Sequence, residues 1–187
     1  WQHDILRRDG TPYRQREAAT IRYLTGASKT PPSLPAVAVP TAEREAILWR
    51  CTMEPPASDW FQPGFDDSAW TQSPAPFGRV EPDIGRQPRT PWTGADIWLR
   101  REFDMPAKAF SELALIIHHD EDVEVFLDGV LAAKLAGFNA AYESCPLAPE
   151  AAALLKPGQH LWAVHCRQTV GGQYIDVGIE GVPTDAK

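Results

Sequence analysis

The densest group of potentially reactive side chains is the run His118-His119-Asp120-Glu121-Asp122. Imidazole nitrogens and carboxylate oxygens bind divalent metals, and the same groups act as general acids and bases. The run follows an apolar, strand-like stretch, and successive residues of a strand point to opposite faces. His118 and His119 therefore do not converge easily on one ion, and we expect a polar turn between two strands. The alternative interpretation is a small hydrolase that uses the acidic turn at Asp120.

A second candidate site is the carboxylate pair Asp66 and Asp67, followed by Ser68. Carboxylates suit a structural calcium ion, which takes six to eight oxygen ligands. Only these two carboxylates lie together here, and either of them could instead cap a helical turn that leads to Trp70. The sequence favours capping, and structural calcium is the one cofactor that it suggests.

Sugar binding is the third possibility, because aromatic rings stack on pyranose faces and amides bind hydroxyl groups. The residues suited to it are Trp92, Trp98, Tyr142, Gln173 and Tyr174. Trp92 stands in a Pro/Gly-containing loop, and Trp98 faces away from Leu99 in an alternating stretch. The competing interpretation is packing, the usual role of aromatic residues in a small sandwich.

The sequence shows no nucleophile in a recognisable context. It contains no GxSxG motif, Gly171-Gly172 lacks a phosphate-loop pattern, and no pair of carboxylates can be assigned to glycoside hydrolysis from spacing alone. Cys51, Cys145 and Cys166 are too few and too far apart for a zinc site, and at least one of the three is unpaired within the chain. We therefore predict no catalytic machinery in this chain.

Composition indicates a folded domain. The 187 residues are 43% hydrophobic and 23% charged, with a net charge of −7, which disfavours nucleic acid and anionic membranes as partners. No apolar run approaches the roughly 18 residues of a membrane span. The chain starts at Trp1 without a signal-peptide pattern. A start at Trp suggests a fragment or processed chain, and we expect a secreted or periplasmic parent protein.

Three segments are predicted. Residues 1–28 form an N-terminal helical segment, whose helix covers 11–24 and stops near Gly26. Residues 29–40 are a Pro-rich linker, since prolines favour a stiff, extended connector. Residues 41–183 form one β domain, which a chain of this length can supply with a core.

Within that domain, short strands alternate with turns and no helix intervenes. Together with the strong turn Asp128-Gly129, this pattern predicts an all-β, jelly-roll sandwich. The predicted strands are 46–53, 96–103, 113–118, 123–127, 130–135, 161–167 and 174–179. The residues expected in the core are Ile97, Leu99, Phe103, Leu115, Ile117, Val123, Val125 and Leu127. The segment 54–96, which follows the first predicted strand, is expected to be irregular. Its aromatic residues are expected to cover one end of the core: Trp60, Phe61, Phe65, Trp70 and Phe77.

Several of these stretches resemble the galactose-binding-like sandwiches, of which the sugar-binding domain of family 2 glycoside hydrolases is the best-known relative. The resemblance spans about 47–179, and His160 departs from the Asn that is usual after the Gly of the last motif. The motifs are PGFDDSAW at 63–70, PFG at 76–78, DIWLRREF at 96–103, HDEDVEVFLDG at 119–129 and LLKPGQHLWAV at 154–164.

The resemblance implies a non-catalytic accessory module that recognises a glycan or polysaccharide weakly or braces a neighbouring catalytic domain. The stretch DILRRDGTPY at 4–13 resembles the end of a glycosidase barrel, which implies that such a domain comes before the linker. The alternative is a purely structural interaction domain that binds no sugar.

Overall fold

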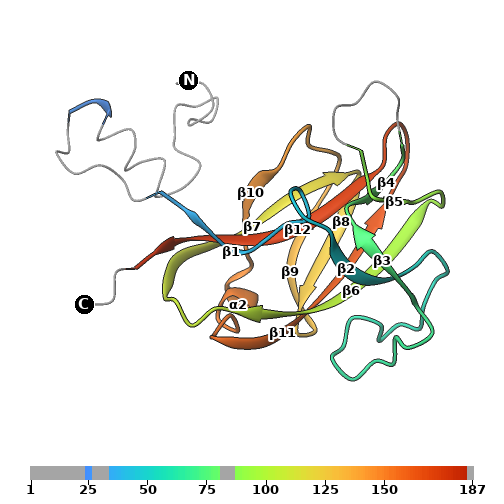
Figure 1. Cartoon of the computed structure of the whole chain (residues 1–187), viewed down its shortest axis with the longest axis horizontal. Coiled ribbons are helices and arrows are strands. Elements are labelled where there is room, and N and C mark those ends of the chain that lie inside the picture. The colour runs from blue at the N-terminus through green and yellow to red at the C-terminus, as the bar shows by residue number, and fades with distance from the viewer. Residues whose placement is uncertain (1–23, 27–33, 81–86, 185–187) are drawn as a thin grey trace. The chain divides into compact units, whose positions relative to one another are not determined.

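The computed structural model describes residues 24–26, 34–80 and 87–184 of the chain. The chain forms two compact units, Trp1–Pro35 and Ala36–Lys187. In the second unit, the described residues build two six-stranded sheets that pack as a sandwich (Figure 1). The predicted all-β sandwich is therefore confirmed.

One sheet, here called the β6 sheet, is antiparallel throughout. Its strands lie side by side in the order β3 (Thr71–Ala75), β2 (Ile47–Thr52), β6 (Asp96–Met105), β11 (Gly158–Arg167), β8 (Asp122–Leu127) and β9 (Val130–Leu135). The long pairing of β6 with β11 forms its centre.

The other sheet, here called the β12 sheet, is centred on the pairing of β7 with β12. Its strands are β10 (Glu143–Pro146), β7 (Phe110–Asp120), β12 (Tyr174–Pro183), β4 (Phe77–Gly78) and β5 (Thr90–Pro91), and β1 (Ala36–Val39) pairs with β12. The helix α2 (Pro149–Ala152) is a single turn. None of the helical residues described here form a segment long and apolar enough to cross a membrane.

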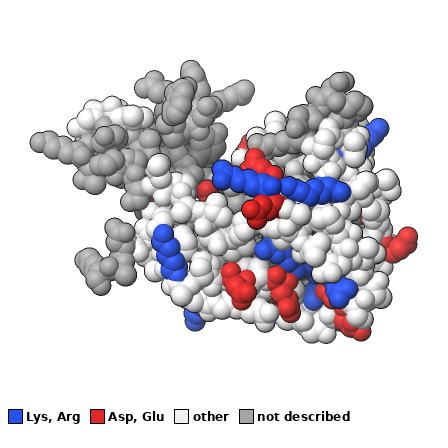
Figure 2. Space-filling view, viewed as in Figure 1, with Lys and Arg blue, Asp and Glu red and all other residues white. Residues whose placement is uncertain are grey.

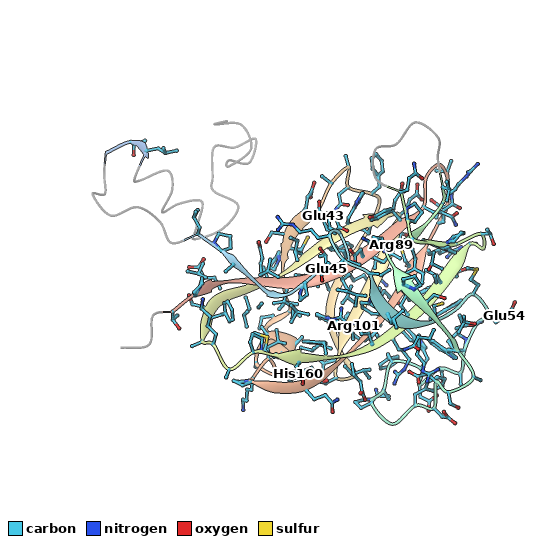
Figure 3. All side chains as sticks on the ribbon, viewed as in Figure 1. Glu43, Glu45, Glu54, Arg89, Arg101 and His160 are labelled. Carbon is cyan, nitrogen blue, oxygen red and sulfur yellow. The ribbon has the colours of Figure 1, made fainter. Side chains whose placement is uncertain are left out.

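The inner faces of the two sheets supply the core. All eight residues predicted for it are buried, and none is more than 5% exposed. Trp49, Trp92 and Trp162 join them as the largest buried side chains. Arg101, labelled in Figure 3, is an exception on the inner side of β6. Its guanidinium lies over the ring of Trp49, 5.5 Å from the centroid. Alternation along each strand thus decides which residues form the core.

The segment 36–39 differs from its prediction. It was assigned to the linker, whereas the structure makes it strand β1, paired with β12 through Ala36↔Gly181 and Val39↔Ile179. The prediction failed because Pro35 and Pro40 were read as parts of a linker. Both lie just outside the strand, where a missing N–H group removes no hydrogen bond between strands. The predicted helix 11–24 lies outside the described residues, apart from Leu24.

The section 54–96 is also more regular than expected, since it contains β3, β4 and β5. Strand β3 contains Pro74, which is tolerated because β3 is at the edge of the β6 sheet. The predicted hairpin at Asp128-Gly129 is confirmed. Its residues have φ values of 49° and 83°, the left-handed conformations that a two-residue hairpin turn requires.

The segment 54–70 is here called the aromatic loop. Its aromatic residues do not cover one end of the core as predicted. Trp60, Phe61, Phe65 and Trp70 pack instead on the outer face of the β6 sheet, in a second apolar cluster with Trp98, Phe126 and Ala163. Phe77 belongs to the main core. The reason is that outward-facing positions of β6, β8 and β11 are themselves apolar, so this face also needs a cover.

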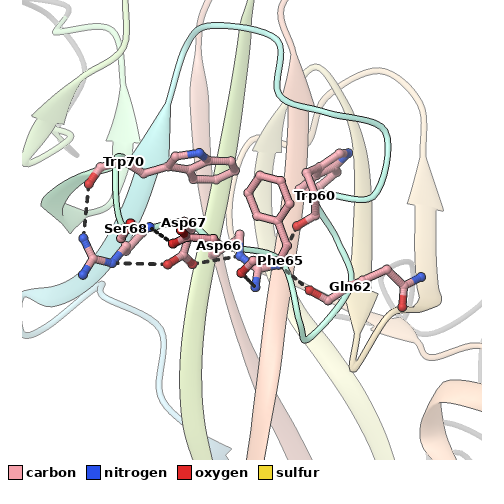
Figure 4. A network of polar contacts seen from close by, with 9 residues as sticks. Trp60, Gln62, Phe65, Asp66, Asp67, Ser68 and Trp70 are labelled. Carbon is pink, nitrogen blue, oxygen red and sulfur yellow. Dashed lines mark hydrogen bonds and ion pairs between the residues drawn. The ribbon is translucent and has the colours of Figure 1, made fainter.

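A buried arginine attaches the aromatic loop to the sheet (Figure 4). Arg100 is 3% exposed and its Nε donates to Asp67 Oδ2 at 2.8 Å. Its Nη1 donates to the carbonyl oxygens of Trp60 at 2.5 Å and Gln62 at 3.1 Å, and Nη2 lies 3.5 Å from that of Phe65. A buried cation is tolerated because nearly all its donors have acceptors.

Replacing Arg100 with Lys should lower the free energy of unfolding by about 2–4 kcal/mol, because one ammonium cannot reach all of these acceptors. Near-ultraviolet circular dichroism should lose part of its tryptophan signal as the loop loosens. Arg50→Lys is the matched control: Arg50 also pairs with Asp67, but it is 41% exposed, so less than about 1 kcal/mol is expected. If chemical denaturation shows the same loss of unfolding free energy for Arg100→Lys and Arg50→Lys, the anchoring role of Arg100 is contradicted.

Candidate functional site

A polar groove with a volume of about 600 Å³ lies on the outer face of the β6 sheet. The residues that line it include Leu48, Arg50, Phe65, Gln72, Glu102 and Gln159. Cross-strand register gathers them, because Arg50 on β2 lies opposite both Gln72 on β3 and Arg100 on β6. Side chains at such outward positions on neighbouring strands lie close together.

The polar side chains of the groove are partly fixed. Arg50 Nη1 donates to the carbonyl of Trp70 at 3.2 Å, and its Nε lies 3.4 Å from Asp67 Oδ1. Gln159 Nε2 donates to Glu102 Oε2 at 3.1 Å. The aromatic loop forms one wall. A guanidinium, two amides and a carboxylate can together donate to and accept from several hydroxyl groups.

His160, labelled in Figure 3, also lines the groove and contacts the Asp128-Gly129 turn. Its Nδ1 lies 2.6 Å from Asp128 Oδ2, and its Nε2 lies 2.7 Å from the carbonyl oxygen of Lys156. Partial burial lowers the pKa of His160, but these two acceptors outweigh it and the net shift is upward. His160 thus ties β11 to the hairpin at the position where the resembling domains carry Asn.

A second group, here called the tyrosine cluster, lies on the outer face of the β12 sheet. The rings of His118 and Tyr174 are tilted, with centroids 4.2 Å apart, and the Tyr142 ring meets that of His118 edge-on at 5.5 Å. Tyr142 Oη donates to Asp176 Oδ2 at 2.6 Å and lies 3.4 Å from Tyr174 Oη. Two of the five residues predicted to contact sugar are therefore brought together.

Asp176 anchors the tyrosine cluster from below. It is 3% exposed and also accepts hydrogen bonds from the backbone N–H groups of Ala42 at 2.8 Å and Val177 at 3.0 Å. Burial raises the pKa of Asp176 to about 6, although these donors and Arg101 oppose the shift. Burial, and next the charge of Asp176, raise the pKa of Tyr142, which therefore stays a protonated donor.

The other three predicted contacts serve the fold. Trp92 is fully buried, and its Nε1 donates to the carbonyl of Asp96 at 3.2 Å, so its ring offers no face to a ligand. Trp98 is buried and stacks on His165 at 4.7 Å. Gln173 Nε2 donates to the carbonyl of Gly94 at 2.6 Å and joins two loops. Burial removes the Trp92 ring from reach of a ligand, whereas sugar contact by Trp98 and Gln173 stays a prediction.

The His/Asp/Glu run divides between the two faces as expected. His118 faces outward in the tyrosine cluster, whereas His119 is buried, with Nδ1 2.5 Å from the carbonyl of Glu121. The acidic side chains hold neighbouring loops: Glu121 Oε2 accepts from the N–H of Thr169, and Asp122 Oδ1 from that of Gly137. Among the described residues, no three His, Cys, Asp or Glu side chains are grouped to hold a metal ion.

The carboxylate pair at 66–67 has partners in the protein. Asp66 Oδ1 accepts from the N–H of Ser68 at 3.0 Å, the local capping bond that the sequence favoured. Asp67 pairs with Arg100 at 2.8 Å and with Arg50 at 3.4 Å. Structural calcium stays a hypothesis, because both carboxylates already have partners in the protein.

The groove residues escaped the sequence analysis. Arg50 and Gln72 belong to none of the motifs given above, and Glu102 and Gln159 lie in motifs at positions to which the sequence assigned no role. The four residues come from four different strands. The available signal was their outward position in alternating strands. It was not usable for Gln72, because β3 was not predicted, nor for Gln159, because β11 was expected to begin at Leu161.

Solved structures with the same fold are parts of much longer glycosidases. A β-glucuronidase from Ruminococcus gnavus matches with a TM-score of 0.55 and 14% identity, over 80% of this chain and 29% of that one. A β-glucuronidase from an uncultured Clostridium gives 0.52 and 12%, over 80% and 29%. A glycosyl hydrolase family 2 member from Bacteroides cellulosilyticus gives 0.50 and 15%, over 76% and 21%.

At these identities the matches show the fold. They confirm the resemblance to the sandwich domain of family 2 glycosidases, and this chain spans less than a third of each of those proteins. No protein-family model and no curated protein matches the sequence.

The raised pKa of Asp176 predicts a pH dependence of stability. Between about pH 4 and pH 6 the folded state retains a proton that the unfolded state releases, so this residue makes stability fall as pH rises across that window. Asp176→Asn should remove this decline. Urea unfolding of both proteins at several pH values measures it, and parallel stability profiles from pH 4 to 6 would refute the assignment.

His160 should cause a second pH dependence of stability. Its pKa is raised, so the stabilisation that it provides is complete below its ordinary value of 6.5 and is lost as pH rises through the folded pKa. His160→Asn should lack this loss. The wild type should therefore lose stability relative to the variant as pH rises above 6.5, the ordinary pKa of the group, measured by thermal unfolding. A constant difference across that range would show that the imidazole is not charged when bound to Asp128.

Proposed function

We propose that this chain is a non-catalytic accessory domain of a larger glycoside hydrolase and that it recognises glycan weakly. The observation that supports the first part is the fold: a β-sandwich matching about a fifth to a third of each of several glycosidase chains. Recognition of an adjacent catalytic domain, and a secreted or periplasmic parent, belong to the same proposal. Fold alone does not carry function, so the glycan must be tested directly.

The tyrosine cluster is the first proposed contact for sugar. The ring of Tyr142 is half-buried, and its hydroxyl is held by the buried Asp176. A ring whose position is already fixed loses little conformational entropy when a pyranose stacks on it. Tyr174 is only 8% exposed and supports Tyr142 from the side. Weak binding is expected, because a shallow site removes little ligand surface from water.

Bracing of a neighbouring domain is the second candidate function, and exposed apolar side chains favour it. Val80, Phe138 and Val170 are 57%, 70% and 73% exposed. All three follow strand ends that meet at one end of the sandwich, where Tyr174 pairs with Gly78 and Asp120. Single exposed apolar residues are common, but a group of them suits contact with another protein surface.

Titration of the chain against a panel of plant and microbial polysaccharides, with reducing-sugar release followed in parallel, tests the proposal. We expect weak binding without release. Tyr142→Ala should weaken binding, whereas Tyr142→Phe should largely preserve it because the ring remains. Phe138→Ala is the control and should leave glycan binding unchanged.

Release of sugar by the chain alone would overturn the non-catalytic assignment. A flat titration with every polysaccharide would reject glycan recognition and favour bracing, which Phe138→Ala should then impair in a pull-down with the separately expressed catalytic domain.

A further inference from the structure

We propose that the polar groove on the β6 sheet is a second saccharide-binding site, specific for uncharged sugars. The inference rests on the proposed function, in that it assigns glycan recognition to a further surface. The groove and the tyrosine cluster lie on the outer faces of different sheets, so each can be tested without disturbing the other.

The size of the groove suits a short saccharide. Its volume of about 600 Å³ lies within the range of roughly 300–1,000 Å³ found for small-molecule sites. It is open on the sheet surface rather than enclosed, because Leu48, Gln72, Glu102 and Gln159 are all exposed. A ligand can therefore enter without any movement of the backbone.

The side chains in the groove have the chemistry of hydroxyl recognition. The amides of Gln72 and Gln159 each offer a donor and an acceptor, Glu102 offers acceptors and Arg50 offers donors. Gln159 already donates to Glu102, which orders both groups side by side at 3.1 Å. Leu48 and the wall residue Phe65 supply apolar surface for the C–H groups of a sugar ring.

The charge balance of the groove indicates a neutral ligand. Three arginines and three carboxylates line the groove: Arg50, Arg100, Arg101, Asp67, Glu102 and Asp128. Asp67 pairs with Arg100 and Arg50, and Asp128 pairs with His160. Acidic and basic residues are likewise interspersed on the face shown in Figure 2, with no broad patch of one sign. A polyanionic glycan would find no excess of positive charge to offset its desolvation.

The position of Arg50 is preorganised. Its contacts with Trp70 and Asp67 hold the guanidinium against the aromatic loop, which Arg100 in turn attaches to the sheet. Groups that are already oriented lose less freedom on binding. The groove is therefore a built surface and depends on the same loop anchor as the rest of this face.

Nuclear magnetic resonance of the ¹⁵N-labelled chain with neutral oligosaccharides of glucose, xylose, mannose and galactose tests the site. The side-chain amide signals of Gln72 and Gln159 should shift in a saturable manner, while those of Gln168 and Gln173, in loops at one end of the sandwich, should not. Gln72→Ala and Glu102→Ala should each weaken binding about three- to tenfold, as expected for one lost hydrogen bond.

Gln168→Ala and Glu150→Ala are the matched controls, because both residues lie outside the groove, Glu150 exposed and Gln168 partly buried. Binding that both groove variants retain in full, but that Tyr142→Ala abolishes, would overturn the groove and leave the proposed function standing. Tighter, salt-sensitive binding of a sulfated glycan would overturn the assignment to uncharged sugars. Failure of the wild type to bind any saccharide would overturn both proposals.

Discussion

The buried guanidinium of Arg100 is the interaction on which the outer side of the β6 sheet depends. A cation removed from water costs several kcal/mol unless acceptors surround it. Here the acceptors are the carboxylate of Asp67 and the carbonyl oxygens of Trp60, Gln62 and Phe65, all from the aromatic loop. The loop satisfies the arginine, and the arginine holds the loop in its conformation.

The two outer faces use the same principle with opposite charge. On the β6 sheet a buried cation holds a loop, and the loop becomes the wall of the polar groove. On the β12 sheet a buried carboxylate, Asp176, holds the backbone at Ala42 and the hydroxyl of Tyr142. A fold shared with parts of long glycosidases thus carries two surfaces whose chemistry comes from side chains outside the core.

Local patterns predicted much of the sandwich. Alternation in 96–103 and 123–127 identified the inward-facing residues, and all eight predicted core residues are buried, because the strand period of two leaves only one face for each apolar set. The Asp-Gly turn was equally readable, since its left-handed conformations are costly for most other residues. Strands β1 and β3 were not predicted because of their prolines. Proline is tolerated just outside a strand, as beside β1, or in an edge strand, as in β3. Whether a strand is at an edge depends on its neighbours in the sheet, which the local sequence does not show.

What the sequence determined by itself is therefore the class of the fold, the core faces and the separation of His118 from His119, all set by steric rules that act between near neighbours. Only the tertiary structure decided which aromatic residues reach solvent. Trp92 and Tyr142 looked alike as loop residues, yet one is fully buried and the other half-exposed. It also assembled the groove, because Arg50, Gln72, Glu102 and Gln159 become neighbours only through the register of four strands that are distant in the chain.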